Sequence, residues 1–481
     1  MKLLTIALFL NFSIIHILSA TTFNQLLQIQ TELSSEHCQE QVQTLTSLFK
    51  NYIPNKEDIE LYSQDTTILL EQFFQARMAI HRKLESLPQR CIQDIKGLYR
   101  EMRKVEDHIG VLGYKDIQLS PKEIDFNKQA TPLIEGNKFR PYFKNMQNVQ
   151  LLPGDIMITK GVSIISSTIS NMSIEPSVFS HIVYVYQDAD RALGTIESYI
   201  GKGVQLFPLD VALKNENARI LVLRAKDRSL AQKAHRYIYE RVKKSIEDHQ
   251  TIHYDYKLDF SDNTSLSCEE IAYDAFNVAS LGKFKIPFAS SYVYLKDKKF
   301  LKSSGLRDGE NMLPSDMEVD PRFEVVLDWT DYRLIRDNHR KDALLKAIFS
   351  WINKKNYQMN NTFTSSLGKI LWSTRQISFL WPLASRLTGI PKDFEPQVPG
   401  TGIAFISNLK ALESALLPKL EIADRNFFSK HGRYMLEAEM ISLLENIRQE
   451  DEWMFSHKRK NDFHYFFRSP DLKIKIYRDL I

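Results

Sequence analysis

The chain has few of the residues that interrupt ordered structure and little excess of charge of either sign. Its 481 residues include 17 glycines and 17 prolines, and it has no low-complexity tract, which argues against long disordered linkers. The formal net charge is +4, and no basic stripe or nucleic-acid-binding motif accompanies it. We therefore expect a globular protein of roughly three domains that does not bind nucleic acid.

Long apolar runs are confined to the N-terminus, so no later segment is expected to span a membrane. Met1-Lys2 form a short positive start, Leu3 to Leu18 are almost wholly apolar, and Ser19-Ala20 are small residues before Thr21. This order is typical of a signal peptide over residues 1–20 and predicts an exported protein, either periplasmic or secreted. An N-terminal membrane anchor is the alternative, although spanning a bilayer needs about 20 apolar residues.

Cysteine is scarce, and its number is odd. An exported protein meets an oxidising compartment, where cysteines tend to pair. Cys38 and Cys91 both lie in the N-terminal region and are candidates for a disulfide, which would stabilise the fold by about 2 to 4 kcal/mol. Two buried free thiols are the alternative. If the first two cysteines pair, Cys268 is left alone.

Patterns of metal ligands are missing as well. His235, His249 and His253 lack the spacing of a ligand set, and no paired cysteines accompany them. We therefore expect no metal site and no cofactor.

Residues 21–145 are expected to form a helical domain. Apolar residues recur at intervals of three or four over residues 69–87 and 95–112, while Pro54 and Pro88 fall at turns. The pattern predicts a helical hairpin or three-helix layer that packs on itself or on the next domain. A coiled-coil surface for a protein partner is the alternative, although the heptads are short and irregular.

Residues 146–335 change to short strands bounded by turns, which predicts an α+β domain with a mostly antiparallel sheet. The expected strands cover residues 156–159, 179–186, 194–200, 204–207, 219–223 and 323–327, and the expected helices cover residues 230–246 and 268–279.

Residues 336–481 return to helical periodicity, so we expect a C-terminal helical domain. Within it, residues 365–388 combine Leu, Ile, Trp and Phe with Lys369, Arg375 and Arg386. Such a basic, aromatic segment fits either peripheral contact with a membrane surface or a buried helix pair.

Cys268 is the candidate nucleophile. It follows Ser265-Leu266-Ser267 and precedes Glu269-Glu270-Ile271, a pattern that predicts a helix N-terminus, where the thiolate form is favoured. The alternative is a buried cysteine that acts as a small apolar residue.

A nucleophilic cysteine needs a base and a group that orients the base. His181 begins a predicted strand, and Glu197 lies on the next one. If the connecting hairpin is centred on Ala189, His181 and Glu197 stand opposite each other, so that the carboxylate can hold the imidazole. A lone histidine on such a strand is otherwise a core residue.

An ordered series of short motifs carries a family resemblance. The motifs are Leu-Pro-Gly-Asp-Ile (152–156), Phe-Ser-His-Ile-Val (179–183), Ile-Glu-Ser (196–198), Gly-Lys-Gly-Val (201–204), Tyr-Asp-Tyr (254–256) and Ser-Cys-Glu-Glu-Ile (267–271). Over about residues 150–330 the chain resembles the YiiX/YebB-like permuted papain-like hydrolases, within the circularly permuted NlpC-type group. The resemblance implies a circularly permuted papain-like core, here flanked by helical domains.

The same resemblance implies roles for individual residues. Cys268 would be the nucleophile, His181 the base and Glu197 the orienting group, with Tyr254 in the substrate-binding pocket. Glu269 stands where the family often has a small residue. A carboxylate beside the sulfur opposes thiolate formation by like charge.

These observations lead us to expect an exported cysteine hydrolase of the amidase or peptidase type. It would cleave a peptide amide or an acyl lipid through a thioester intermediate. One alternative is a lipid acyltransferase or phospholipase-like enzyme that uses the same cysteine. The other is a non-catalytic helical scaffold with an inactive papain-like core.

Overall fold

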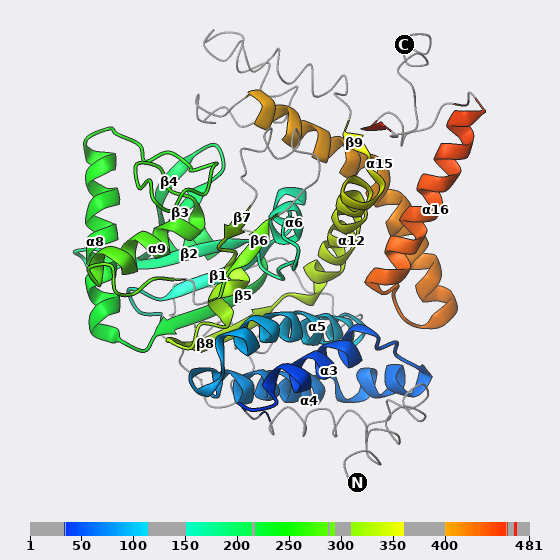
Figure 1. Cartoon of the computed structure of the whole chain (residues 1–481), viewed down its shortest axis with the longest axis horizontal. Coiled ribbons are helices and arrows are strands. Elements are labelled where there is room, and N and C mark those ends of the chain that lie inside the picture. Colours follow the sequence, from blue (N-terminus) through cyan, green and yellow to red (C-terminus); the bar gives the residue numbers. More distant parts are fainter. Residues whose placement is uncertain are drawn as a thin grey trace.

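The computed structural model describes residues 33, 35–113, 151–213, 217–286, 289–293, 309–359, 400–457, 459 and 466–468 (Figure 1). The expected signal peptide and the basic, aromatic segment 365–388 lie outside these residues. The described part has an α+β fold. No helix in that part is both long enough and apolar enough to cross a membrane.

Within the described residues, six strands form one sheet in the order β4-β3-β2-β1-β5-β8, and every neighbouring pair is antiparallel. The strands are β1 (Ile156–Gly161), β2 (His181–Gln187), β3 (Leu193–Tyr199), β4 (Gly203–Pro208), β5 (Asn217–Ala225) and β8 (Phe323–Thr330). Two short pairs complete the strands: β6 (Ser291–Val293) with β7 (Gly309–Asn311), and β9 (Gln358–Met359) with β10 (Phe467–Arg468).

Helices lie before, between and after the strands. The N-terminal ones are α3 (Cys38–Lys50), α4 (Lys56–His81) and α5 (Gln89–Gly113), with a short 3-10 turn η1 (Leu84–Ser86) between the last two. The middle region holds α6 (Ile164–Asn171), α7 (Leu209–Leu213), α8 (Arg228–Glu247), α9 (Cys268–Ala279) and α11 (Pro314–Glu318). The C-terminal helices are α12 (Tyr332–Lys355), α15 (Gly400–His431) and α16 (Glu437–Ser456).

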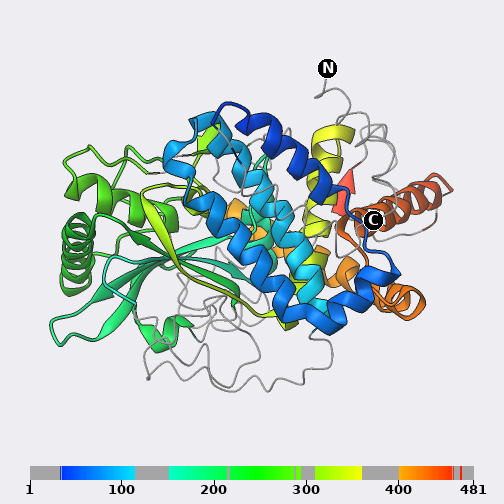
Figure 2. The same cartoon turned by 90° about the horizontal axis from the view of Figure 1, so that it is seen from below.

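The N-terminal helices lie side by side next to the sheet (Figure 2). A capping box between Asn55 and Asp58 begins α4. Cys38 and Cys91 form a disulfide that joins α3 to α5, with their Cα atoms 5.9 Å apart. α4 ends at His81, before the end of the apolar pattern expected over 69–87. Leu84 lies in η1, and Leu87 is extended, as a residue that precedes proline tends to be.

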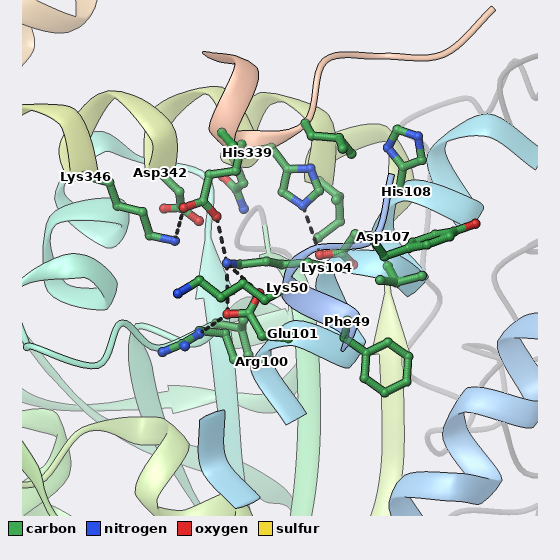
Figure 3. Close-up of a pocket in the computed structure, with 18 of the residues that line it drawn as sticks. Phe49, Lys50, Arg100, Glu101, Lys104, Asp107, His108, His339, Asp342 and Lys346 are labelled. Carbon is green, nitrogen blue, oxygen red and sulfur yellow. Dashed lines mark hydrogen bonds and ion pairs between the residues drawn. The ribbon is translucent and has the colours of Figure 1, made fainter. Parts of the chain in front are cut away.

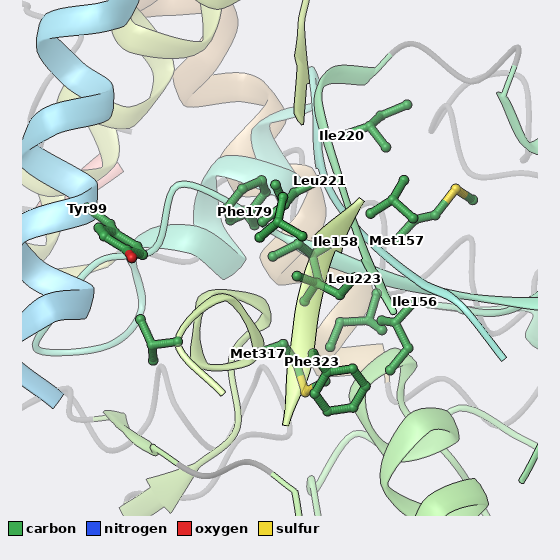
Figure 4. Close-up of a cluster of buried hydrophobic side chains, with 14 of the residues drawn as sticks. Tyr99, Ile156, Met157, Ile158, Phe179, Ile220, Leu221, Leu223, Met317 and Phe323 are labelled. Carbon is green, nitrogen blue, oxygen red and sulfur yellow. The ribbon is translucent and has the colours of Figure 1, made fainter. Parts of the chain in front are cut away.

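The core of the sheet is continuous with that of the N-terminal helices (Figure 4). Ile158 and Leu221 are cross-strand partners on the sheet face that packs toward Tyr99 of α5. Alternation places their neighbours Met157 and Ile220 on the opposite face. The two faces therefore have separate surroundings.

Buried ion pairs also hold the N-terminal helices to the sheet. Asp328 of β8 is completely buried and accepts hydrogen bonds from Arg77 Nη2 at 2.7 Å and from Arg103 Nη1 at 2.9 Å. Arg103 of α5 also donates to Glu318 of α11 at 2.5 Å. Because unpaired charges are costly inside a protein, this network fixes how α4 and α5 sit on the sheet.

The C-terminal helices share a second apolar cluster with α6, and it includes Leu344, Ile348, Leu412, Leu416 and Leu444. The helical pattern expected over 409–448 divides into α15 and α16. The break comes at Gly432, which follows the last residue of α15 and has a φ of +68°. A left-handed glycine is a common way to end a helix.

Candidate functional site

The Leu-Pro-Gly-Asp motif forms the tight turn that leads into β1. Gly154 has a φ of +87°, and a Cβ atom there would lie 2.8 Å from the carbonyl oxygen of Ala231. The buried carboxylate of Asp155 accepts the backbone N–H of Leu152 at 2.8 Å and two hydrogen bonds from Arg224 at 2.9 and 2.7 Å. The motif thus fixes the position of β1, the neighbour of the strand that carries His181.

The structure brings His181 and Glu197 into direct contact. His181 Nε2 lies 3.0 Å from Glu197 Oε2, and the carboxylate is buried. Two hydroxyl groups also donate to this carboxylate, Tyr199 Oη at 2.6 Å and Thr195 Oγ1 at 2.8 Å. Glu197 is therefore held firmly and in turn fixes the orientation of the imidazole.

The predicted register of the β2–β3 hairpin is wrong by two residues. The observed pairs include Val185 with Thr195 and Gln187 with Leu193, which centres the hairpin on Asp190 instead of Ala189. Continuing this register places Tyr199, and not Glu197, opposite His181. The rings of His181 and Tyr199 stack with centroids 5.2 Å apart. Because a shift of two residues keeps each side chain on its face, Glu197 still reaches His181 diagonally.

Cys268 is the first residue of α9, as expected. Ser267 caps the helix in a capping box with Glu270. Ser198 Oγ donates to the carbonyl of Leu266 at 2.6 Å, which ties β3 to the segment just before the cysteine. The thiol also lies near the beginning of β2, because the backbone amide of Ile182, the residue after His181, acts on it.

The thiol is not in the activated state that its helix position predicts. It is 3 % exposed, and its Sγ donates to Glu269 Oε2 at 3.2 Å. Burial raises the pKa of Cys268 well above its usual value, and the Glu269 carboxylate adds to this rise. The backbone amides of Ile182 and Cys268 act in the opposite direction but do not outweigh burial.

Glu269 is itself a buried carboxyl group. Burial raises its pKa, while the backbone and the positive charge that His181 can carry lower it. The sulfur, the carboxyl group and the imidazole therefore lie within electrostatic range of one another. Any charge that forms on one of them changes the proton affinity of the others.

All four predicted site residues line one cavity of about 410 Å³: Cys268, His181, Glu197 and Tyr254. The pKa of Tyr254 is raised well above its usual value, first by burial and then by the charges of Cys268 and Glu269. Much of the remaining wall is apolar and is formed by Met157, Val162, Ile165, Ile169, Val183, Ile200 and Ile220.

Sequence reasoning missed the two hydroxyl donors on Glu197. Thr195 and Tyr199 lie two residues before and after it on the same strand. Strand alternation therefore places all three side chains on one face, and this signal is present in the sequence.

Among the described residues, no group of three His, Cys, Asp or Glu side chains is arranged to hold a metal ion.

Comparison of the chain with protein-family models, with curated proteins and with solved structures gave no match.

Proposed function

We propose that the chain is a cysteine hydrolase with a circularly permuted papain-like core, which cleaves an amide or ester through a thioester on Cys268. The observation that carries the proposal is the shared cavity. Cys268, His181, Glu197 and Tyr254 come from four separate segments and line the same space. The hydrogen bond of 3.0 Å between His181 and Glu197 supplies the oriented base that a cysteine nucleophile needs.

The reaction would proceed in two steps. His181 uses Nε2 for Glu197, so Nδ1 takes the proton of the Cys268 thiol. The thiolate attacks the carbonyl carbon, and the N–H of the first residue of α9 donates to the developing oxyanion. Collapse of this intermediate breaks the bond to the leaving group, which takes the proton from His181. Water, deprotonated by His181, then hydrolyses the thioester and regenerates the thiol.

Glu269 acts on the resting state in this scheme. Its carboxylate accepts a hydrogen bond from the thiol, with Sγ and Oε2 3.2 Å apart, and stabilises the neutral thiol. A substrate that displaces Glu269 or favours its protonated form removes this restraint and lets the thiol ionise toward His181. The proposal therefore expects an enzyme whose nucleophile is weak until the substrate is bound.

The shape and lining of the cavity favour an apolar acyl group. Residues such as Met157, Ile165 and Ile220 form its wall, and Tyr254 belongs to the lining together with Cys268. The substrates that fit the proposal are peptide amides and acyl lipids outside the cytoplasm, since we also propose that the chain is exported.

The apolar wall supports a second candidate, transfer of the acyl group to an acceptor other than water. The thioester would form in the same way, and an alcohol or amine would replace water in the second step. The enzyme would then be a lipid acyltransferase or a phospholipase-like protein.

Trapping of the acyl group tests the proposal. Full-length protein is incubated with phospholipid vesicles or with peptidoglycan fragments, and intact-mass spectrometry measures adducts. We expect one acyl group on Cys268 with one of the two substrates and none on Cys268→Ala. With the wild type, release of free acid indicates hydrolysis, and an acylated acceptor indicates transfer. Equal adducts on wild type and Cys268→Ala, or turnover undiminished in the variant, would exclude Cys268 as the nucleophile. Equal adducts without turnover would favour the hypothesis of a non-catalytic helical scaffold.

A further inference from the structure

A second cavity, of about 500 Å³, lies away from the cysteine (Figure 3). Its walls come from the α3–α4 connection, α5, α12 and α16, together with Lys160 of β1 and Arg219 of β5. Lys160 and Arg219 are cross-strand partners, so they share a sheet face. Thr159 and Ile220, their neighbours along the strands, line the cysteine cavity on the opposite face.

Positive charge predominates around this second cavity. Among the described residues that line it, seven Lys and Arg side chains face five Asp and Glu side chains. Two of the cations share one anion, since Glu437 accepts both Lys346 Nζ at 2.6 Å and Lys104 Nζ at 2.9 Å. Burial lowers the pKa of Lys346 to about 8 even with Glu437 beside it. Burial therefore outweighs the neighbouring carboxylate in setting the pKa of Lys346.

Lys50, the last residue of α3, has no ion-pair partner among the described residues. Its side chain extends toward the same space as Lys104 and Lys346 (Figure 3). Lys50 is exposed, so its ammonium group reaches the cavity from the rim.

Several of the buried residues that line the cavity carry a polar side-chain atom without a hydrogen-bond partner among the described residues. These atoms include Asn171 Oδ1, Arg219 Nε, His108 Nε2 and both side-chain polar atoms of Asn338. Each of these four residues is more than nine-tenths buried. A buried polar atom without a partner costs about 1 to 3 kcal/mol, so the polar side of this lining is the side suited to a polar group.

Apolar side chains occupy the rest of the lining, including Phe49, Val105, Ile335 and Met435. A small inorganic ion would leave this part of the cavity unfilled. A molecule with one anionic group and a short apolar body matches both parts.

We propose that the second cavity binds a small amphipathic organic anion, with a carboxylate or phosphate head and a short apolar chain. Arg219, Asn338 and Lys50 supply donors for the head, and Phe49, Val105 and Ile335 contact the chain. None of Cys268, His181 and Glu197 lines this cavity, so the proposal is independent of the hydrolase proposal.

Calorimetric titration of the full-length Cys268→Ser protein tests this site without turnover. The probes are octyl phosphate, octanoate, inorganic phosphate, octyl glucoside and octyltrimethylammonium, each used below its micellar concentration. We expect one molecule of octyl phosphate or octanoate per chain, bound at least tenfold more tightly than the neutral, the cationic and the chain-free probes. The stronger of the two anions identifies the head as a phosphate ester or a carboxylate.

Three variants assign the binding to this cavity. Lys50→Glu changes an exposed residue and is expected to weaken anion binding at least tenfold, as is Lys346→Met, which leaves Glu437 paired with Lys104. Lys233→Glu on α8, an exposed lysine that does not line the cavity, is the matched control and is expected to bind as the parent does. Unchanged affinity in Lys50→Glu and Lys346→Met, or equal binding of anionic and neutral octyl probes, would overturn the proposal.

Discussion

Glu269 stands next to the proposed nucleophile in the sequence and contacts its sulfur in the structure. The helix N-terminus and the backbone amides favour a thiolate, while burial and this carboxylate oppose it. The balance lies with the neutral thiol, because burial is the largest contribution. Glu269 thus adds to burial in keeping Cys268 neutral before substrate is bound.

Replacing Glu269 with glutamine should therefore activate the thiol. Glu269→Gln removes the neighbouring negative charge and keeps the shape of the side chain, so the pKa of Cys268 should fall. We expect iodoacetamide to alkylate Cys268 about tenfold faster at pH 7, which corresponds to about one pKa unit. Glu270→Gln is the matched control, because it alters the next carboxyl group in the chain and leaves the contact with the sulfur. Equal rates in Glu269→Gln and wild type would show that the carboxylate does not restrain the thiol.

The raised pKa of Glu270 predicts that the free energy of unfolding depends on pH. Burial raises its pKa to about 8, and Asp255 adds to the rise. An exposed glutamate titrates near 4.3, so between these two values the folded chain holds a proton that the unfolded chain releases. The free energy of unfolding should therefore fall as pH rises through this window.

Glu270→Gln should remove this contribution, since glutamine does not titrate and can still complete the capping box. Urea unfolding of both proteins at pH 5 and pH 9 measures the effect. We expect the variant to gain about 4 kcal/mol relative to wild type between these two pH values. Parallel changes in the two proteins would show that Glu270 does not have a raised pKa.

At the scale of elements, the β2–β3 hairpin shows how far sequence reasoning reaches. Alternation along two predicted strands is enough to place His181 and Glu197 on the same face. The register depends on the turn, where Asp188 and Ala192 form the closing pair and Arg191 has a φ of +65°. Neither feature follows from strand patterns. The sequence therefore predicts the contact between His181 and Glu197 but places the centre of the hairpin one residue too early.

The docking of α4 and α5 on the sheet depends on Asp328. Its carboxylate is completely buried and pairs with two arginines from different helices. Asp328→Asn would leave Arg77 and Arg103 without their shared charge, and we expect it to lower the free energy of unfolding by about 3 kcal/mol. Glu324→Gln, at an exposed position of the same strand, is the control and should change stability little. Urea unfolding checks both, and equal stabilities would contradict a structural role for the network.

At the scale of the whole molecule, the helical regions and the sheet are closely joined. The sequence indicates where helical and strand periodicity change, and most predicted strands appear within a few residues of their expected ends. The second cavity was not predicted, because Lys50, Lys160, Arg219 and Lys346 are far apart in the chain and have no common motif. Only the packing of α3, α5 and α12 around the sheet brings them together.

The disulfide between Cys38 and Cys91 should stabilise the whole molecule through the N-terminal layer. It closes a loop across a sequence separation of 53 residues. Removing it in a Cys38→Ser, Cys91→Ser double variant should lower the free energy of unfolding by about 2 to 4 kcal/mol. The labelling rate of Cys268 should stay the same, because the disulfide is not part of its cavity. A large change in that rate would indicate that the N-terminal helices help to shape the cysteine site.

The most direct test of the central claim is the rate at which Cys268 reacts with a thiol-directed acylating probe in wild type and in His181→Asn. The two proteins are compared at pH 7 under non-reducing conditions, with Cys268→Ala as the blank. If His181 takes the thiol proton, the variant should react about 100-fold more slowly, while its circular dichroism and thermal midpoint stay close to those of wild type. Equal rates in wild type and His181→Asn would contradict the claim that Cys268 and His181 form a catalytic pair.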